Sequence, residues 1–363
     1  MIIDADGHIM LPPDIWDKYF ERGALYDRRP RRVPDNFGRT RLMVDGEFIP
    51  RRFGRWRGSG AGDQPERRRP GGRDPVERLK DMDAEGIDVA VNFPSGILAL
   101  PQVIDAAMAV AMTRAYHDWL HEYCTAVPKR LKGVAVIALQ DVPTAVKELE
   151  RCVKDYGFVG AFVAPNFQGK NLDEPMFQPI WEACQRLDIP ALVHSGPGAN
   201  AAGTERFDNF FYVHSVQFPF ENMIALMTMI GGGVFDEFPS LRVAYLESGC
   251  GWVPYWMERL DDQAKLEKFD TPLLPRRLKQ RPSDYIKTRC FFSCEPGEES
   301  TPWVAEQIGA DRLVFASDYS HFDSKFPNTV KLVRETKGLA SVAADKILSD
   351  NSLALFGRRL TNG

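Results

Sequence analysis

The chain has 363 residues and a formal net charge of -4 at pH 7. Its length suits either two domains or one α/β barrel with insertions, and its acidic balance argues against nucleic-acid binding, because phosphate recognition needs a basic surface. Its six cysteines form no Cys-x-x-Cys pair, no signal peptide opens the sequence, and no apolar run approaches the roughly 18 residues of a membrane helix, so we expect a cytoplasmic protein with reduced thiols.

The first predicted strand, residues 1–8, begins with apolar residues and ends in side chains that can bind a metal. Side chains of a strand alternate between its two faces, so Asp4, Asp6 and His8 are expected to share a face and reach one point. Gly7 leaves room there for a ligand or another backbone. A hydrogen-bonded turn carries the same residue types, so this motif alone leaves both interpretations open.

Residues 22–74 form a long excursion rich in Arg, Gly and Pro. Within it, Asp45-Gly46 at the centre of residues 42–49 predicts a tight hairpin. The arginines suit a solvated surface or a subunit contact. The alternative is a lid that supplies a guanidinium to an anionic substrate, because Arg binds carboxylates in a bidentate manner.

From residue 74 onward, apolar strands alternate with helical segments of ordinary length. With the first strand, the predicted strands cover residues 1–8, 87–93, 131–139, 158–165, 190–194, 241–247, 289–294 and 312–317. The predicted helices cover residues 75–85, 102–124, 142–156, 176–187, 219–230, 251–262, 303–308, 330–336 and 343–356. We therefore predict that residues 1–363 form a single α/β domain, a (β/α)8 TIM barrel with an Arg-rich insertion at 22–74, whose chemistry lies at the C-terminal strand ends.

Polar residues stand where these strands end, and in a barrel they converge on one mouth. They are Asp6 and His8 after strand one, His194 after strand five, Glu247 after strand six, Glu295 after strand seven and Asp318 after strand eight. Each alone has an ordinary structural role, such as capping a helix. Together, imidazoles and carboxylates suit a divalent zinc, manganese or iron ion.

Taken as a set, six motifs resemble the amidohydrolase superfamily, in particular the branch that contains aminocarboxymuconate-semialdehyde, γ-resorcylate and 5-carboxyvanillate decarboxylases. The motifs are DADGH at 4–8, RLKDMDAEGID at 78–88, PALVH at 190–194, GGGVFDEFP at 231–239, ESGCGWVP at 247–254 and FASDY at 315–319. The resemblance covers almost the whole chain. It implies that Asp6, His8, His194 and Asp318 bind a metal, and that Asp318 also handles protons.

The sequence departs from the resemblance at strand six, where the well-known decarboxylases carry a histidine implicated in catalysis and this chain has Glu247. A carboxylate does not replace an imidazole, but it can bind a second cation or act as a general base. Alternatively, Glu247 accepts hydrogen bonds from the backbone N–H groups of the following helix.

Four further histidines divide into two pairs. His214, in a predicted loop after strand five, and His321, just past Asp318, are candidates to complete a second metal position or to orient substrate. Ordinary loop hydrogen bonds are the alternative for both. His117 and His121 lie four residues apart on a predicted helix; this spacing suits a metal, but a surface or interface position is expected because the helix is far from the strand ends.

Three enzymatic hypotheses follow. In a metal-dependent hydrolase, Asp318 or Glu247 deprotonates a metal-activated water that attacks an ester, thioester, amide or lactone carbonyl. In a nonoxidative decarboxylase of an aromatic or unsaturated acid, Asp318 protonates the ring carbon and an insertion arginine holds the anion. In a dinuclear iron or iron–manganese enzyme, Glu247 bridges two ions with His214 or His321 added, for two-metal hydrolysis or oxygen activation.

A non-catalytic partner subunit is the remaining alternative, and the survival of all the expected ligands weakens it. A small, anionic substrate and a homo-oligomer are expected. The Arg-rich insertion and the aromatic residues 207–212 are the candidate contact surfaces.

Overall fold

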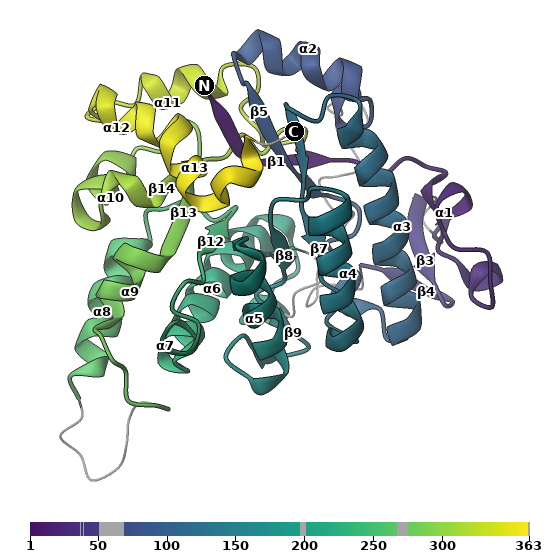
Figure 1. The fold of residues 1–363 in the computed structure, drawn as a ribbon, viewed down its shortest axis with the longest axis horizontal. Coiled ribbons are helices and arrows are strands. Elements are labelled where there is room, and N and C mark those ends of the chain that lie inside the picture. The colour runs from purple at the N-terminus through teal and green to yellow at the C-terminus, as the bar shows by residue number, and fades with distance from the viewer. Residues whose placement is uncertain (37, 39, 51–68, 197–200, 267–274, 362–363) are drawn as a thin grey trace.

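Parallel strands form the centre of the computed structural model, which describes residues 1–36, 38, 40–50, 69–196, 201–266 and 275–361 (Figure 1). One sheet joins β1 (Ile3–Ile9), β5 (Val89–Pro94) and β6 (Leu131–Gly133). A second joins β7 (Ala135–Val136), β8 (Ala161–Val163), β11 (Ala191–His194), β12 (Val243–Leu246), β13 (Cys290–Cys294) and β14 (Leu313–Phe315). The pairings within both sheets are parallel.

The two sheets meet at both of their edges. Strands β6 and β7 are one run of chain interrupted at Val134. On the other side, the Asp318 N–H donates to Asp6 O at 3.0 Å, and the His8 N–H donates to Tyr319 O at 2.7 Å. These bonds join the end of β14 to β1, so the predicted strands are all present and close into a parallel barrel.

Helices follow the strands and cover the outside of the barrel (Figure 1). The longer ones are α2 (Pro75–Glu85), α3 (Ala106–Thr125), α4 (Val142–Asp155), α5 (Gln178–Leu187), α6 (Phe210–Gly231), α8 (Val253–Ala264), α9 (Pro282–Arg289) and α10 (Thr301–Ile308). The shorter ones are α1 (Ile15–Lys18), α7 (Val234–Glu237), α11 (Thr329–Arg334), α12 (Ser341–Asp345) and α13 (Asn351–Phe356), with a π-helical segment at Lys346–Asp350. The 3-10 turns are Tyr26–Arg28, Pro70–Gly72, Leu100–Gln102, Pro175–Phe177, Thr204–Arg206, Ala310–Arg312 and Gly357–Leu360.

Helix α2 has the predicted bounds because its sequence carries clear signals at both ends. The Asp74 side chain accepts hydrogen bonds from the N–H groups of Val76 and Glu77, Pro75 occupies the first helical position, and Gly86 ends the helix at φ 73°. The helix contacts β1 through Arg78, whose Nη2 lies 3.5 Å from Asp4 Oδ2.

Helix α6 is longer than predicted, because it begins at Phe210 rather than at Pro219. The Asn209 side chain caps it by accepting from the Tyr212 N–H, and Pro219 lies inside it. A proline usually marks a helix start, which explains the error. His214 and most of the aromatic residues 207–212 therefore lie on a helix, not in the predicted loop.

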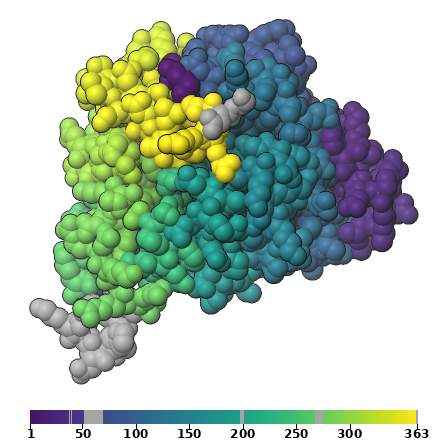
Figure 2. Space-filling view, viewed as in Figure 1, coloured from purple at the N-terminus to yellow at the C-terminus, as the bar shows by residue number. Residues whose placement is uncertain are grey.

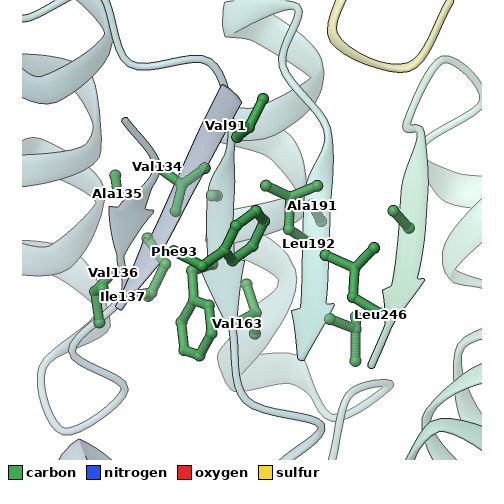
Figure 3. Packing of buried hydrophobic residues seen from close by; sticks show 14 of the residues in the cluster. Val91, Phe93, Val134, Ala135, Val136, Ile137, Val163, Ala191, Leu192 and Leu246 are labelled. Carbon is green, nitrogen blue, oxygen red and sulfur yellow. The ribbon is translucent and has the colours of Figure 1, made fainter. Parts of the chain in front are cut away.

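The barrel interior is filled by apolar side chains from neighbouring strands. Val91 and Phe93 of β5, Val163 of β8 and Leu192 of β11 are fully buried, and Figure 3 shows them packed together with Leu246 of β12. This packing fixes the strand register at close-packed density. It therefore holds the residues at the strand ends at one mouth.

The predicted hairpin is confirmed in a small antiparallel sheet of β2 (Arg31–Pro34), β3 (Thr40–Val44) and β4 (Glu47–Ile49). Its turn residues Asp45 and Gly46 have φ values of 50° and 83°, as a tight hairpin turn requires. This sheet lies at one edge of the molecule (Figure 2). Two further short strands, β9 (Asn166–Phe167) and β10 (Lys170–Asn171), form a separate antiparallel pair.

Two expectations about single residue types have opposite outcomes. All six thiols are free and buried, as expected. The surface position predicted for His117 is wrong, because its buried ring makes a 2.7 Å contact with Glu148 and accepts the Val136 N–H at 2.9 Å.

Within the described residues, no helix combines the length and apolar character needed to span a bilayer.

Candidate metal centre at the barrel mouth

Strand β1 brings Asp6 and His8 to the mouth but not Asp4, contrary to the expectation from strict alternation. The register of β1 against β5 shifts between Asp4 and Gly7. The Asp4 carboxylate instead accepts the Ser317 N–H at 2.9 Å and the Ser317 hydroxyl at 2.6 Å. The space beside Gly7 is taken by Arg78 rather than by a ligand or backbone, since a Cβ on Gly7 would lie 2.3 Å from Arg78 Nη2.

Four of the other predicted strand-end residues converge on His8, whereas Glu295 lies in the lining of the cavity above it. Its Nε2 lies 3.2 Å from His194 Nε2, 3.4 Å from Glu247 Oε2 and 3.6 Å from Asp318 Oδ1. Asp6 Oδ1 is 3.5 Å from the same nitrogen. Five residues from the ends of four strands, β1, β11, β12 and β14, therefore meet at one point.

Two of these residues have an unusual backbone. Glu247 and Asp318 follow β12 and β14 at φ values of 52° and 50°, in the left-handed region that non-glycine residues rarely adopt. Such conformations cost free energy and persist where the surrounding structure enforces them. Here they turn both carboxylates towards the imidazoles at the centre of the mouth.

The orientation of His8 and His194 fits a metal ion. His8 Nδ1 lies 3.2 Å from Pro94 O, and His194 Nδ1 lies 2.5 Å from Ser195 O. Carbonyl oxygens only accept, so each Nδ1 carries the hydrogen and each neutral ring turns the lone pair of Nε2 towards the other ring. Two lone pairs 3.2 Å apart repel unless a proton or a cation lies between them.

Unsatisfied oxygens at the same point also fit a cation. Asp6 Oδ1, Glu247 Oε2 and Asp318 Oδ1 are buried and have no hydrogen-bond partner of suitable geometry. Buried carboxylate oxygens without a partner are costly. The residues present therefore fit a divalent ion bound by Asp6, His8 and His194, with Glu247 and Asp318 beside it.

Burial and crowding shift the pKa of each group in this cluster. Burial, and after it the charge of His321, lower the pKa of His8 to about 3, so His8 is neutral. Burial raises the pKa of Asp6 to about 7. For His194, burial acts to lower the pKa, but Glu247 and Asp6 outweigh it and raise the pKa to about 9. Without a metal, a proton on His194 therefore occupies this centre.

The two carboxylates that follow β12 and β14 shift in opposite directions. Burial, and then the charge of Glu247, hold the pKa of Asp318 well above its ordinary value. Burial acts to raise the pKa of Glu247 as well, but His194 outweighs it and lowers that pKa. Without a metal, Asp318 is therefore the carboxyl that tends to keep a proton.

His321 belongs to the cluster, whereas His214 lies beside it. His321 Nδ1 is 2.6 Å from Asp318 Oδ1, and its Nε2 is 3.0 Å from Ser95 Oγ. The His321 ring stacks on His8 with centroids 4.0 Å apart. His214 lies on α6, where it is 3.8 Å from Asp323 and stacks on Phe210.

The structure contradicts the purely structural interpretation of Glu247. The N–H groups of Cys250 and Gly251, just before α8, donate to Glu298 at 2.9 Å, not to Glu247. Glu247 is positioned instead by its own N–H, which donates to Ser293 Oγ at 3.0 Å. Its carboxylate is thus available at the mouth.

A cavity of about 250 Å³ opens over this centre. It is lined by Asp6, Glu247 and Asp318, by His214 and Phe218 of α6, and by Glu295, Asp323 and Lys325 among others. The volume lies near the lower limit for ligand pockets and suits a small substrate. None of the described residues between 22 and 74 lines this cavity, and residues 51–68, with many of the predicted lid arginines, lie outside the described residues.

Sequence reasoning missed Ser95, Ser293, Glu298 and Lys325. Ser95 directly follows β5, so the rule that used the other strand ends could have found it. The remaining three carry no local sequence signal, because each contacts a residue that lies between 29 and 48 positions away along the chain.

A (β/α)8 barrel with imidazoles and carboxylates joined at its C-terminal mouth defines a metal-dependent enzyme. The family model described as amidohydrolase matches residues 3–358, so the chain belongs to the amidohydrolase family. This confirms the resemblance inferred from the sequence motifs.

Three similar proteins carry related names. A γ-resorcylate decarboxylase of Polaromonas sp. is 30% identical over 272 residues, which are 69% of this chain and 80% of that protein. A 2-amino-3-carboxymuconate-6-semialdehyde decarboxylase of Dictyostelium discoideum is 25% identical over 293 residues, covering 78% and 77% of the two chains. The solved structure of a dihydroxybenzoic acid decarboxylase from Polaromonas sp., with bound manganese and 2-nitroresorcinol, has a TM-score of 0.68 at 23% identity and covers 98% and 96% of the chains.

Proposed function

We propose that this protein is a metal-dependent, nonoxidative decarboxylase of a small aromatic or unsaturated carboxylic acid. The similar proteins favour this hypothesis over hydrolysis, since they are named as decarboxylases of such acids. The observation that carries the proposal is the 2.6 Å contact between Asp318 Oδ1 and His321 Nδ1, a carboxyl–imidazole pair suited to carrying a proton. Decarboxylation needs such a proton donor at the carbon that loses CO2.

In this mechanism the substrate enters with its carboxylate towards Asp6, His8 and His194, which would hold the ion. A bound divalent ion supplies positive charge that neutralises the substrate anion. Asp318 donates its proton to the ring carbon. The electrons of the breaking carbon–carboxylate bond become the new C–H bond, and CO2 leaves. His321 then returns a proton to Asp318 from the solvent side.

The cavity also supplies groups that orient the substrate. Lys325 lines it with Nζ 2.6 Å from Pro296 O, so its ammonium is fixed near the mouth. Phe218 and Pro219 of α6 provide apolar contact for a flat ring. A planar acid with one carboxylate fits this cavity, because Lys325 can pair with the carboxylate while Phe218 and Pro219 contact the ring.

Hydrolysis remains a second candidate because of Glu247. A carboxylate in place of the expected imidazole suits deprotonation of a water molecule, which attacks a carbonyl that carries a leaving group. This role would use Glu247 Oε2, which is buried and lies 2.7 Å from His194 Nε2.

One experiment separates the two candidates. Protein loaded with Mn²⁺ is incubated with γ-resorcylate and other hydroxybenzoates while released CO2 is trapped, and in parallel with a panel of esters and lactones. Decarboxylation predicts CO2 in equal amount to the decarboxylated phenol. Hydrolysis of an ester or lactone without CO2 from any acid would replace the first proposal with the second.

The domain organisation, the role of the insertion and the oligomeric state are also proposals. We infer that residues 1–363 form one domain, that residues 22–74 are an insertion that forms either a solvated or subunit surface or a lid whose arginines approach the substrate anion, and that the enzyme is a cytoplasmic homo-oligomer. Limited proteolysis and light scattering test the first and last of these. Paired substitutions of Arg55 and Arg57 test the second through the substrate KM.

A further inference from the structure

We infer that His214 is a specificity-determining residue, which limits the length of the acid because it ends the cavity one helical turn beyond Phe218. The acid that fits has a single ring, or an unsaturated chain of similar length. The inference rests on the proposed function, since it takes the acid to enter this cavity with its carboxylate towards the metal centre. It deepens that function by naming the size of the substrate.

Helix α6 carries aromatic rings at four-residue intervals on one face. Phe210, His214 and Phe218 occupy positions i, i+4 and i+8, so their side chains follow one another along the helix. The ring centroid of His214 lies 4.7 Å from that of Phe210 and 5.0 Å from that of Phe218. Four residues of helix advance by about 6 Å. The three rings therefore mark successive distances along the helix.

The inner end of this row is fixed at the metal centre. The Phe218 ring lies edge-on to the ring of His194, with centroids 6.4 Å apart. One turn further along α6, the buried Asn222 donates from Nδ2 to Leu246 O and to Ser248 Oγ, both at 2.8 Å. These hydrogen bonds attach the helix to the end of β12, so the distance from the metal centre to each ring of the row is set by the fold.

The outer end of the cavity coincides with His214. Among the described residues of α6, those that line the cavity are His214, Ser215, Phe218 and Pro219, which lie on successive turns. Phe210, one turn further out, does not line it. Phe218 is buried, whereas His214 is partly exposed, as expected where a cavity reaches the surface. Along this helix the cavity therefore runs from Phe218 to His214.

The His214 ring is held in place by the loop that follows β14. Its Nε2 lies 3.8 Å from Asp323 Oδ2, and its ring centroid lies 6.3 Å from that of Phe322. Phe322 also makes an edge contact with Phe210, at 5.8 Å between centroids. An acid that reached past His214 would have to displace packed aromatic side chains, which costs free energy.

The interval between Phe218 and His214 suits one ring. When the carboxylate of an aromatic acid faces the metal centre, its ring lies against Phe218. The ring position opposite the carboxylate then points outward, towards His214. One helical turn is close to the length of a single aromatic ring. A second ring attached at that position would therefore meet the imidazole of His214.

The test compares two acids that differ only in length. The full chain, loaded with Mn²⁺, is titrated in a calorimeter with 2-hydroxybenzoate and with 2-hydroxy-4-phenylbenzoate, whose second ring extends the first away from the carboxylate. We expect the wild type to bind the longer acid at least about tenfold more weakly, as pockets that select by size do. His214→Ala should remove this difference. Equal Kd values in the wild type, or an unchanged ratio in His214→Ala, overturns the inference.

Two control variants separate length from other effects of the substitution. Phe211→Ala removes a ring that is 73% exposed on the same helix and does not line the cavity, so the ratio of Kd values should stay that of the wild type. His214→Phe keeps a ring of similar size without the contact to Asp323, so it should restore the discrimination. A lost discrimination in either control would show that the His214 ring is not the stop.

A further variant decides the question if His214→Ala does not fold. His214→Trp places a larger ring at the end of the cavity, so 2-hydroxybenzoate itself should bind at least about tenfold more weakly than to the wild type. Unchanged binding of 2-hydroxybenzoate to His214→Trp would overturn the inference.

Binding and turnover distinguish this inference from the proposed function. Length-dependent binding without CO2 release from either acid would support the role of His214 and count against decarboxylation. CO2 release from both acids with equal kcat/KM would support decarboxylation and overturn the role of His214. Binding of neither acid to the wild type would count against both.

Discussion

Asp318 and His321 lie three positions apart, and their contact brings a buried carboxyl to an imidazole whose other nitrogen faces Ser95. Burial raises the pKa of Asp318, so the carboxyl tends to keep a proton. That proton is the one a decarboxylase must deliver to carbon. The left-handed backbone of Asp318 indicates that the surrounding fold maintains this position at a cost in stability.

We therefore expect Asp318→Asn to slow CO2 release about 10²–10⁴-fold, the usual contribution of a positioned proton donor. The amide keeps one oxygen donor but cannot deliver the proton. The measurement is kcat for CO2 release, with Mn content determined in the same sample. Asp323→Asn is the matched control, because Asp323 lines the same cavity but lies beside His214, and it should change kcat by less than about tenfold. Full activity in Asp318→Asn would remove Asp318 from the mechanism.

Between elements, a buried contact joins α2, β1 and the end of β14 directly behind the metal centre. Arg78 of α2 is 1% exposed, with Nη2 at 3.5 Å from Asp4 and its guanidinium 3.9 Å above the ring of Tyr319. Asp4 in turn holds Ser317 through two hydrogen bonds. This contact keeps Asp6 and Asp318 together, because Asp6 is two residues from Asp4 and Asp318 directly follows Ser317.

Replacing Arg78 by Met should lower the free energy of unfolding by about 3–5 kcal/mol, because it leaves the Asp4 carboxylate buried without its cation. Arg69→Met is the matched control. Arg69 is 42% exposed and pairs with Asp81 at 3.3 Å, so its loss should cost less than about 1 kcal/mol. Urea unfolding of both variants measures the difference. Equal losses in the two would mean that Arg78 does not brace the centre.

Over the whole molecule, the sequence predicts the barrel well and the residues that gather at its mouth in large part. Apolar runs locate every barrel strand, and the residues at their ends, including His194, Glu247 and Asp318, meet at the mouth as the parallel topology requires. The errors have identifiable physical causes. A strand bulge redirects Asp4, and a proline inside α6 hides the helix that carries His214.

Contacts between residues that are far apart in the chain could not be predicted from the sequence. Ser95 and His321 are 226 residues apart, and Glu298 rather than Glu247 accepts the N–H groups before α8. Neither contact follows from local pattern, because each depends on how two loops meet above the barrel. Whether Glu247 caps the following helix could therefore be decided only from the three-dimensional structure.

Protons and a metal ion compete for the same side chains, so the effect of the metal on the free energy of unfolding should depend on pH. In the metal-free protein the pKa of His194 is raised from 6.5 to about 9, so its stabilising proton is fully present below pH 6.5 and is lost as pH rises to about 9. The pKa of Asp6, raised from 3.8 to about 7, acts in the same direction up to neutral pH. Metal binding must displace these protons, so affinity should rise up to about tenfold per pH unit for each proton displaced.

We therefore expect the Tm difference between Mn²⁺-saturated and metal-free protein to grow steadily from pH 6.5 to 9, as measured by calorimetry in matched buffers. Glu247→Gln supplies the internal check. It removes the carboxylate that does most to raise the pKa of His194, so the metal-free variant should release that proton at lower pH and its Tm difference should level off earlier. A Tm difference that stays constant with pH in the wild type would mean that the ion does not replace the His194 proton, and that the ion lies elsewhere in the mouth.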